Sequence, residues 1–304
     1  MSNPVQDEEL TLVAENSRVN ELTEHVIYSR LATSYAEKKP GFAKSLNNLA
    51  ATEKRHYEFW KKYAHGAEAK PNTRRIRLIM FLRFFLGTTF AVKFLEGGEK
   101  KTIAKYNSLE HLIPAADKPA FDAMLIDEVE HEVMFANQLQ SAAIKYISFI
   151  ILGLADAIVE ISGIHAGSLG LYKSTEITGL AGIVAGASAS IAMASAAYAQ
   201  AKQGFQGKPS VSAVFTGISY FVTAVTLAMP YFLTGDKVVA LVSSVVVAIV
   251  VVAFIDYYNS VVSSTSFLRD FGELAGIMLG ATIALYFFGT VVSSLLGITT
   301  PPGG

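Results

Sequence analysis

Long stretches without a charged residue dominate the second half of this chain. Four of them, each 18 to 31 residues long, lie at 177–201, 209–235, 238–255 and 274–304. A fifth, at 146–172, is equally apolar except for Asp156, Glu160 and His165. A helix needs about 20 apolar residues to cross the hydrocarbon core of a bilayer. The pattern therefore predicts five transmembrane helices, at about 147–171, 178–201, 211–234, 238–260 and 274–297.

The first half of the chain carries most of the charge. Residues 1–145 hold 39 of the Lys, Arg, Asp and Glu side chains, and residues 146–304 hold 12. The second half lacks the charged surface that a soluble domain of its size needs, whereas the first half has one. We therefore expect two domains, residues 1–145 outside the bilayer and residues 146–304 within it. The net charge of −1 does not indicate nucleic-acid binding.

The location of the chain follows from its ends and loops. Its first ten residues are acidic and lack the apolar segment of a signal peptide, so we expect residues 1–145 to stay in the cytoplasm of a prokaryotic cell. Basic residues favour the inner flanks of the predicted spans, which also places the C-terminus outside. The inner flanks hold Lys145, Lys202, Lys208 and Arg269, and the outer flanks hold Lys173 and Lys237.

Two carboxylates lie inside the first predicted span. Asp156 and Glu160 are four residues apart and share one helix face. A charge at this depth costs at least a few kcal/mol, so it normally faces a water path, an ion or a partner. No Lys or Arg lies at comparable depth, which favours a transported cation or proton as their partner; a protonated structural pair is the alternative. Met193, in the second span, offers a thioether suited to a transition metal, although a lone Met is more often a packing residue.

Small residues recur at four-residue spacing in the apolar half. Such faces allow helices to approach closely, either within one chain or between two chains, so a homodimer is one interpretation. The repeats are Gly163/Gly167, Gly182/Gly186 and Gly272/Gly276/Gly280.

Hydrophobic spacing in the first half is helical, with no strand-like runs. It predicts four helices, at about 8–36, 42–65, 73–109 and 117–145. The expected fold is therefore all-α: a four-helix bundle followed by a five-helix transmembrane domain. One segment, 78–92, is unusually apolar for a soluble helix yet short for a span. We expect it to be buried in the bundle or in a dimer, or else to lie on the membrane surface.

Glutamate and histidine recur at regular spacing in the predicted bundle. Two Glu-x-x-His motifs lie 75 residues apart, and a further glutamate precedes each of them by 32 residues. The repeated set is Glu21, Glu53 and His56, followed by Glu96, Glu128 and His131. In a four-helix bundle, residues spaced in this way can converge on one central point and hold two metal ions.

Other residues near this repeat leave alternatives open. Glu99 lies three residues after Glu96 and is a candidate seventh ligand. Glu24 competes with Glu21 as the ligand from the first helix. We otherwise expect surface positions for Glu24, His25, Glu130 and Glu132.

Residues 15–140 resemble the rubrerythrin branch of ferritin-like proteins. The likeness rests on Glu21 with Tyr28 and Ala32, and on the motifs Glu53-x-x-His56, Glu96-Gly-Gly-Glu99 and Glu128-x-x-His131. It implies a di-iron centre whose ligands are Glu21, Glu53, His56, Glu96, Glu99, Glu128 and His131. Rubrerythrins usually carry a cysteine-ligated rubredoxin module, and this chain has no Cys. A peroxidase cycle fed by such a module is therefore not expected.

The apolar half resembles the vacuolar iron transporter family. The likeness rests on the stretch 153–163, which contains Asp156 and Glu160, on the stretch 190–195 around Met193, and on the stretches 258–260 and 267–280. It implies an ion path through Asp156 and Met193. The chain departs from the family at Ala157 and Ala197, and only residues 202–208 stand where the family inserts metal-binding helices. Together the two resemblances correspond to the fused architecture of membrane-bound ferritins.

These features predict a proton-coupled transporter of Fe²⁺, with Mn²⁺ as a second candidate ion, that exports iron from the cytosol. The bundle would capture or sense the ion. The alternative is a redox enzyme, a ferroxidase or a peroxide-consuming protein, with the membrane half serving mainly as an anchor.

Overall fold

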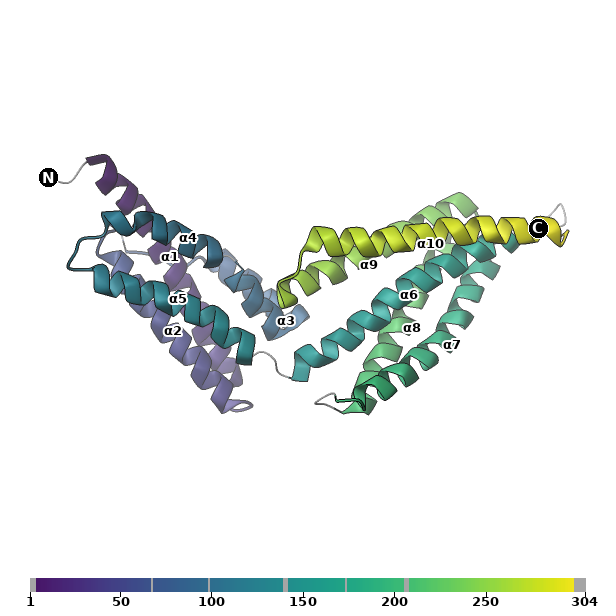
Figure 1. Ribbon diagram of the computed structural model, residues 1–304, viewed down its shortest axis with the longest axis horizontal. Helices are drawn as coiled ribbons and strands as arrows, with labels where there is room; N and C mark the ends of the chain where they lie inside the picture. The colour runs from purple at the N-terminus through teal and green to yellow at the C-terminus, as the bar shows by residue number, and fades with distance from the viewer. Residues whose placement is uncertain are drawn as a thin grey trace. The chain divides into compact units, whose positions relative to one another are not determined.

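The computed structural model describes residues 4–66, 68–97, 99–138, 142–172, 174–204 and 208–297. Within these ranges all regular structure is helical (Figure 1). The helices are α1 (Pro4–Tyr35), α2 (Pro40–Lys61), α3 (Thr73–Glu96), α4 (Glu99–Leu109), the short 3₁₀ helix η1 (Glu110–Leu112), α5 (Lys118–Gln138), α6 (Ala142–Tyr172), α7 (Thr175–Ala201), α8 (Pro209–Leu233), α9 (Lys237–Ser263) and α10 (Phe267–Leu295). The expected all-α class is confirmed for the described part of the chain.

The chain divides into two compact units, Met1–Leu139 and Gln140–Gly304. The boundary expected from the charge distribution, at residue 145, lies a few residues inside the second unit. The first unit contains α1 to α5, and the second contains α6 to α10.

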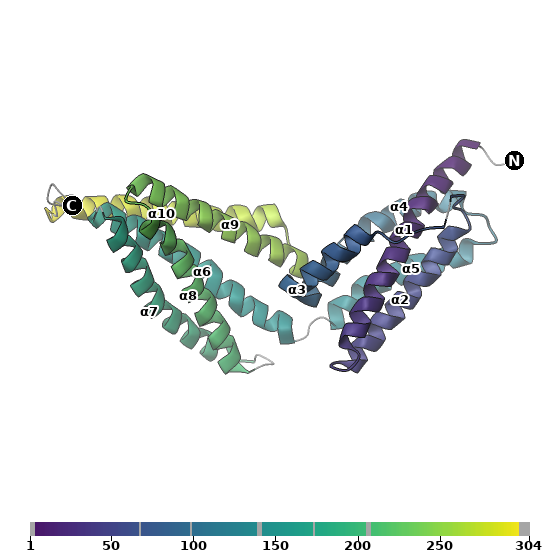
Figure 2. The same ribbon diagram turned by 180° about the vertical axis from the view of Figure 1, so that it is seen from behind.

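In the first unit, α1 and α2 lie side by side along most of their length, and α5 packs against α2 and α4 (Figure 2). An aromatic core forms where the start of α1, the end of α2, the end of α4 and the start of α5 meet. Trp60 and Tyr106 lie there with ring centroids 4.8 Å apart, and Phe121 packs against both Phe59 and Trp60. This core holds the four helices in register with one another. It therefore determines how the acidic residues further along each helix line up.

The third helix predicted for the first unit, at 73–109, is wrong as a single element. Gly87 interrupts α3 with φ 87° and ψ 162°, a conformation that is open essentially to glycine alone. The helix also stops at Glu96, and α4 begins at Glu99. Helical periodicity continues across both interruptions, so the hydrophobic pattern did not reveal them.

In the second unit, α6 packs against α7, α8, α9 and α10. Glycines allow the closest approaches: a Cβ at Gly289 of α10 would overlap the backbone of Gly167 in α6, and one at Gly182 of α7 would overlap the ring of His165. The small residues at these positions therefore serve packing within the chain. The stripe of Gly272, Gly276 and Gly280 differs, because a Cβ at any of the three would meet nothing within 4 Å.

In the described part of the chain, six helices are long and apolar enough to cross a membrane, as judged by length and composition. They are α6 to α10 and, in addition, the 24 residues of α3, whose apolar segment 78–92 is interrupted by Gly87. This finding is consistent with a membrane protein. The last predicted span begins later than α10, because the first two turns of α10 carry charged residues, among them Arg269 and Glu273, which form an ion pair of 2.9 Å.

Candidate metal centre and intramembrane carboxylates

Four acidic and imidazole side chains meet inside the first unit. Glu21 comes from α1, Glu53 and His56 come from α2, and Glu128 comes from α5; all four are buried. Each offers one ligand atom, and these atoms lie within 4.8 Å of one another. Carboxylate oxygens and imidazole nitrogens are a donor set that suits Fe²⁺, Mn²⁺ and Zn²⁺. The cluster could therefore hold a metal ion.

His56 is the centre of this cluster. Its Nδ1 lies 3.2 Å from Glu128 Oε1, 3.6 Å from Glu53 Oε2 and 3.7 Å from Glu21 Oε2. Its other nitrogen, Nε2, faces Asp127 Oδ2 at 3.3 Å. Metal-binding histidines usually donate the N–H that does not face the metal to a carboxylate, which fixes the tautomer and the ring orientation. Asp127 is placed for that role.

The protonation of the cluster reflects its burial. Burial raises the pKa of Glu53 well above its usual value, and it raises the pKa of Glu128 against the opposing effect of His56. For His56, burial acts to lower the pKa, but contacts with Glu128, Glu21 and Glu53 outweigh it, so the pKa is raised. For Glu21, burial is again opposed by His56, and the pKa is lowered. Without a metal, the carboxylates rely on His56 and on bound protons for positive charge.

Two buried tyrosines support the acidic residues. Tyr106 donates a hydrogen bond of 2.7 Å to Glu21 Oε1, and Tyr28 donates one of 2.9 Å to Glu96 Oε1. The second oxygen of Glu96 is buried and has no hydrogen-bond partner among the described residues. Burial raises the pKa of Glu96 well above its usual value, while the Tyr28 hydrogen bond acts to lower it.

Glu24 is not the free surface charge expected from the sequence. Its side chain is 14% exposed and pairs with Arg75 of α3 at 2.9 Å. Burial, acting against Arg75, raises the pKa of Glu24 to about 8. Its neighbour His25 is also partly buried, and its Nδ1 lies 2.6 Å from the carbonyl oxygen of Ala50. Surface positions for these two residues are therefore wrong, because α2 and α3 pack against this part of α1.

The candidate ligands divide into three groups. Glu21, Glu53, His56 and Glu128 come together in one cluster. Glu96 is buried at the end of α3 but is not a member of that cluster. The side chains of Glu99 and His131, like those of Glu130 and Glu132, lie outside the described residues.

Sequence reasoning did not select two residues at this site, Asp127 and Tyr106. Asp127 directly precedes Glu128, and neighbours on a helix point in different directions, so the Glu-x-x-His spacing gave no reason to choose it. Tyr106 lies ten residues after Glu96, which corresponds to nearly three helical turns, and the break between α3 and α4 hides that relation.

In the second unit, the carboxylates of α6 lie next to a tyrosine of α8. Tyr220, which is fully buried, donates a hydrogen bond of 2.6 Å to Glu160 Oε2. Asp156 is partly buried and Glu160 is exposed at the surface of the unit. Met193 of α7 packs against the apolar cluster that includes Ala157 and Tyr220. Residues of three helices, α6, α7 and α8, therefore lie together in the region of Tyr220.

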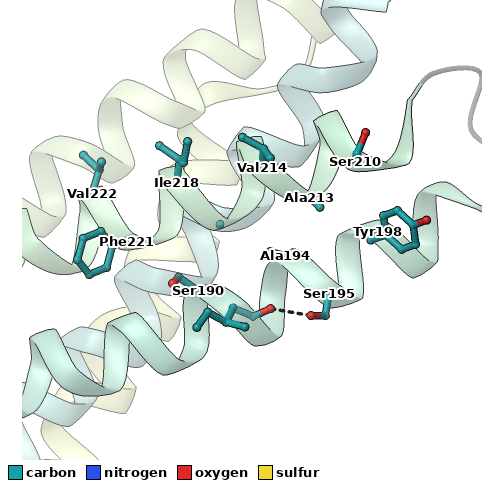
Figure 3. Close-up of a pocket in the computed structure, with 12 residues that line it drawn as sticks. Ser190, Ala194, Ser195, Tyr198, Ser210, Ala213, Val214, Ile218, Phe221 and Val222 are labelled. Carbon is teal, nitrogen blue, oxygen red and sulfur yellow. Dashed lines mark hydrogen bonds between the residues drawn. The ribbon is translucent and has the colours of Figure 1, made fainter.

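A groove of about 850 Å³ runs between α7 and α8 (Figure 3). Its lining is aliphatic and aromatic with a few serines, among them Ser190, Ser195 and Ser210, and it includes no Asp, Glu or His. Ser195 bonds back to the carbonyl oxygen of Ile191 in its own helix. The groove therefore offers no carboxylate or imidazole ligand. Such groups lie elsewhere in this unit, at Asp156 and Glu160 of α6 and at the buried Asp256 of α9, whose Oδ2 has no hydrogen-bond partner among the described residues.

In comparisons with known proteins, no family model, no curated protein and no solved structure matched this chain.

Proposed function

We propose that this protein is a proton-coupled transporter of Fe²⁺, with Mn²⁺ as a second candidate ion, that carries iron out of the cytosol. In this proposal α6 to α10 form the transport domain. The cluster of the first unit captures or senses the ion in the cytoplasm. The resemblances to rubrerythrins and to vacuolar iron transporters support the assignment.

The observation that carries the proposal is the pair Asp156 and Glu160 on a helix that is apolar enough to span a membrane. A helix that serves only as an anchor has no use for two carboxylates, each of which is costly in lipid. Each carboxylate is stable there when it holds either a metal cation or a proton. Alternation between the two partners is antiport in its simplest electrostatic form.

The cluster of the first unit supplies the second part of the proposal. Glu21, Glu53, His56 and Glu128 could bind one ion, and the resemblance to rubrerythrins extends the set to a di-iron centre with Glu96, Glu99 and His131. Such a centre would concentrate iron on the cytoplasmic side.

We further propose that the transporter is a homodimer. The open glycine stripe Gly272, Gly276 and Gly280 on α10 supports this, because it is not used for packing within the chain and permits close approach of another helix.

Ion flux in proteoliposomes tests the transport proposal. Fe²⁺ uptake should follow an imposed pH gradient, and Asp156→Asn should abolish it while the iron bound by the first unit stays unchanged. Glu176→Gln, which removes an exposed carboxylate at the start of α7, is the matched control and should retain flux. Flux equal to the unmodified protein in Asp156→Asn would refute the mechanism.

A second candidate function is oxidation of Fe²⁺ by O₂ or peroxide in the first unit, with the membrane half as an anchor. The observation that favours it is the pair of buried phenols: Tyr106 is hydrogen-bonded to Glu21 of the cluster, and Tyr28 to the buried Glu96. Stopped-flow absorbance with Fe²⁺ and O₂ or peroxide tests it. Rapid turnover together with no flux in proteoliposomes would favour this function over transport.

A further inference from the structure

The first part of α3, residues 73–86, presents an aromatic surface to solvent. Phe81, Phe84 and Phe85 are 58%, 82% and 64% exposed. Their rings form one patch, with centroids 4.6 Å apart for Phe81 and Phe85 and 5.0 Å apart for Phe84 and Phe85. Leu78 extends the patch by one turn and is 47% exposed. An exposed apolar surface of this kind marks an interaction site.

The opposite face of the same segment is attached to α1. Ile76 and Ile79 are buried, Arg75 pairs with Glu24, and the Arg83 guanidinium lies 5.6 Å from the centre of the Tyr35 ring. To cross a bilayer as a separate span, the segment would have to break this ion pair and leave Glu24 buried without its cation. The contacts therefore favour a helix that stays on the first unit and offers one face outward.

The charge around the patch points to the kind of partner. Arg74 and Arg77 are exposed at the start of the helix, and residues 73–92 contain no Asp or Glu. Helices that lie in a membrane interface combine an aromatic and aliphatic face with basic residues, and anionic lipid headgroups attract those residues.

We propose that residues 73–86 lie flat on an anionic membrane surface, with Phe81, Phe84 and Phe85 inserted at the boundary between headgroups and acyl chains. The chain carries its own candidate spans, so the bilayer is present at high effective concentration and a single short helix is enough to make the contact. Gly87 ends this surface helix and lets the chain turn back to the buried stretch from Thr89 to Val92. The docked helix holds the first unit at the membrane through Arg75 and Glu24.

Fluorescence of a single labelled cysteine tests the proposal, because the chain contains no natural Cys. The full-length protein carrying Phe84→Cys and a polarity-sensitive dye is reconstituted in vesicles of phosphatidylglycerol and phosphatidylcholine. We expect the emission of the dye to be shifted to the blue. Lipids that carry a nitroxide near the headgroup should quench it more strongly than lipids that carry one at the end of the acyl chain. Asp122→Cys, exposed at the start of α5, is the control and should not be quenched.

A second set of quenching measurements varies the arginines and the charge of the lipid. Arg74→Gln with Arg77→Gln in the Phe84→Cys protein, or vesicles of phosphatidylcholine alone, should each reduce the shallow quenching. Stronger quenching from the acyl-chain end would identify α3 as a span and overturn the proposal. An unquenched dye that shows energy transfer between labelled copies would identify a second copy of the chain as the occupant, and would also overturn it. An unquenched dye in water would overturn it as well. None of these outcomes depends on ion flux.

Discussion

His56 has two ring nitrogens that face different kinds of neighbour. Nδ1 faces three buried carboxylates, and Nε2 faces the more exposed Asp127, which Arg55 also contacts at 3.1 Å. If a metal takes Nδ1, Asp127 determines how the ring is held. Asp127, next to Glu128, would then influence metal binding without being a ligand itself.

Asp127→Asn should therefore weaken metal binding about tenfold, the lower end of the loss typical for a group that orients a histidine ligand. Titration of the full-length protein with Mn²⁺, which avoids oxidation, measures the affinity. Asp122→Asn removes an exposed carboxylate of the same helix and should leave the affinity unchanged. Equal affinities in the two variants would show that Asp127 has no orienting role.

Metal binding should release protons. Burial raises the pKa of Glu53 well above its usual value and also raises the pKa of Glu128, so both carboxyls hold protons more tightly than in water and an arriving cation must compete with those protons. Because deprotonation becomes easier as pH rises, the Mn²⁺ affinity should increase from about pH 6 to about pH 8. Calorimetry in two buffers with different ionisation enthalpies counts the protons released. A pH-independent affinity with no proton release would contradict this expectation.

In α3, the backbone conformation of a single residue breaks the helix. Neighbouring atoms do not explain why residue 87 is a glycine, since a Cβ at Gly87 would meet nothing within 4 Å. Any loss on substitution is therefore a backbone effect. The break also separates an exposed aromatic segment from the buried residues that lead to Glu96.

Gly87→Ala should lower the free energy of unfolding of the first unit by about 1–3 kcal/mol, the usual cost of a side chain in a region open to glycine. Denaturation followed by tryptophan fluorescence measures it, because the only Trp, Trp60, is fully buried in this unit. Gly41→Ala is the control: it lies in helix α2 with open space around it and should be neutral or slightly stabilising. A loss of the same size in both variants would exclude a special role for the break.

Most elements follow from hydrophobic patterning. The predicted spans at 178–201, 211–234 and 238–260 correspond to α7, α8 and α9 with shifts of a few residues at their ends. The break at Gly87 could not be predicted, because a single glycine inside an apolar run is compatible with a continuous helix. Equal spacing selected the four clustered residues Glu21, Glu53, His56 and Glu128. It carries no information on Asp127, Tyr106 or the Glu24–Arg75 pair. Those contacts depend on how the helices rotate against one another.

The candidate metal cluster and the carboxylates of α6 belong to different units. The acidic cluster lies in the first unit with Trp60, whereas Asp156, Glu160 and Met193 lie in the second. The two units can therefore be followed separately in one intact protein.

Mn²⁺ should stabilise the first unit selectively. At a free concentration one hundred times its dissociation constant, a ligand that binds only the folded state adds about 2.7 kcal/mol of stability. In detergent, the thermal transition of Trp60 fluorescence should move upward, while unfolding of α6 to α10, followed by backbone amide hydrogen exchange or limited proteolysis, should stay in place. His56→Ala should remove the shift. An equal shift of both transitions would mean that the principal ion site is not confined to the first unit.

The contacts between α6 and α8 constrain any transport cycle. Thr216 donates to the carbonyl oxygen of Phe149 at 3.0 Å, Ser219 donates to that of Ile150 at 3.2 Å, and Tyr220 holds Glu160 further along. Gly153 leaves no room for a Cβ against Thr216. We therefore expect these two helices to move as one rigid piece, so that the conformational change of the proposed transport cycle would come from the helices around that piece.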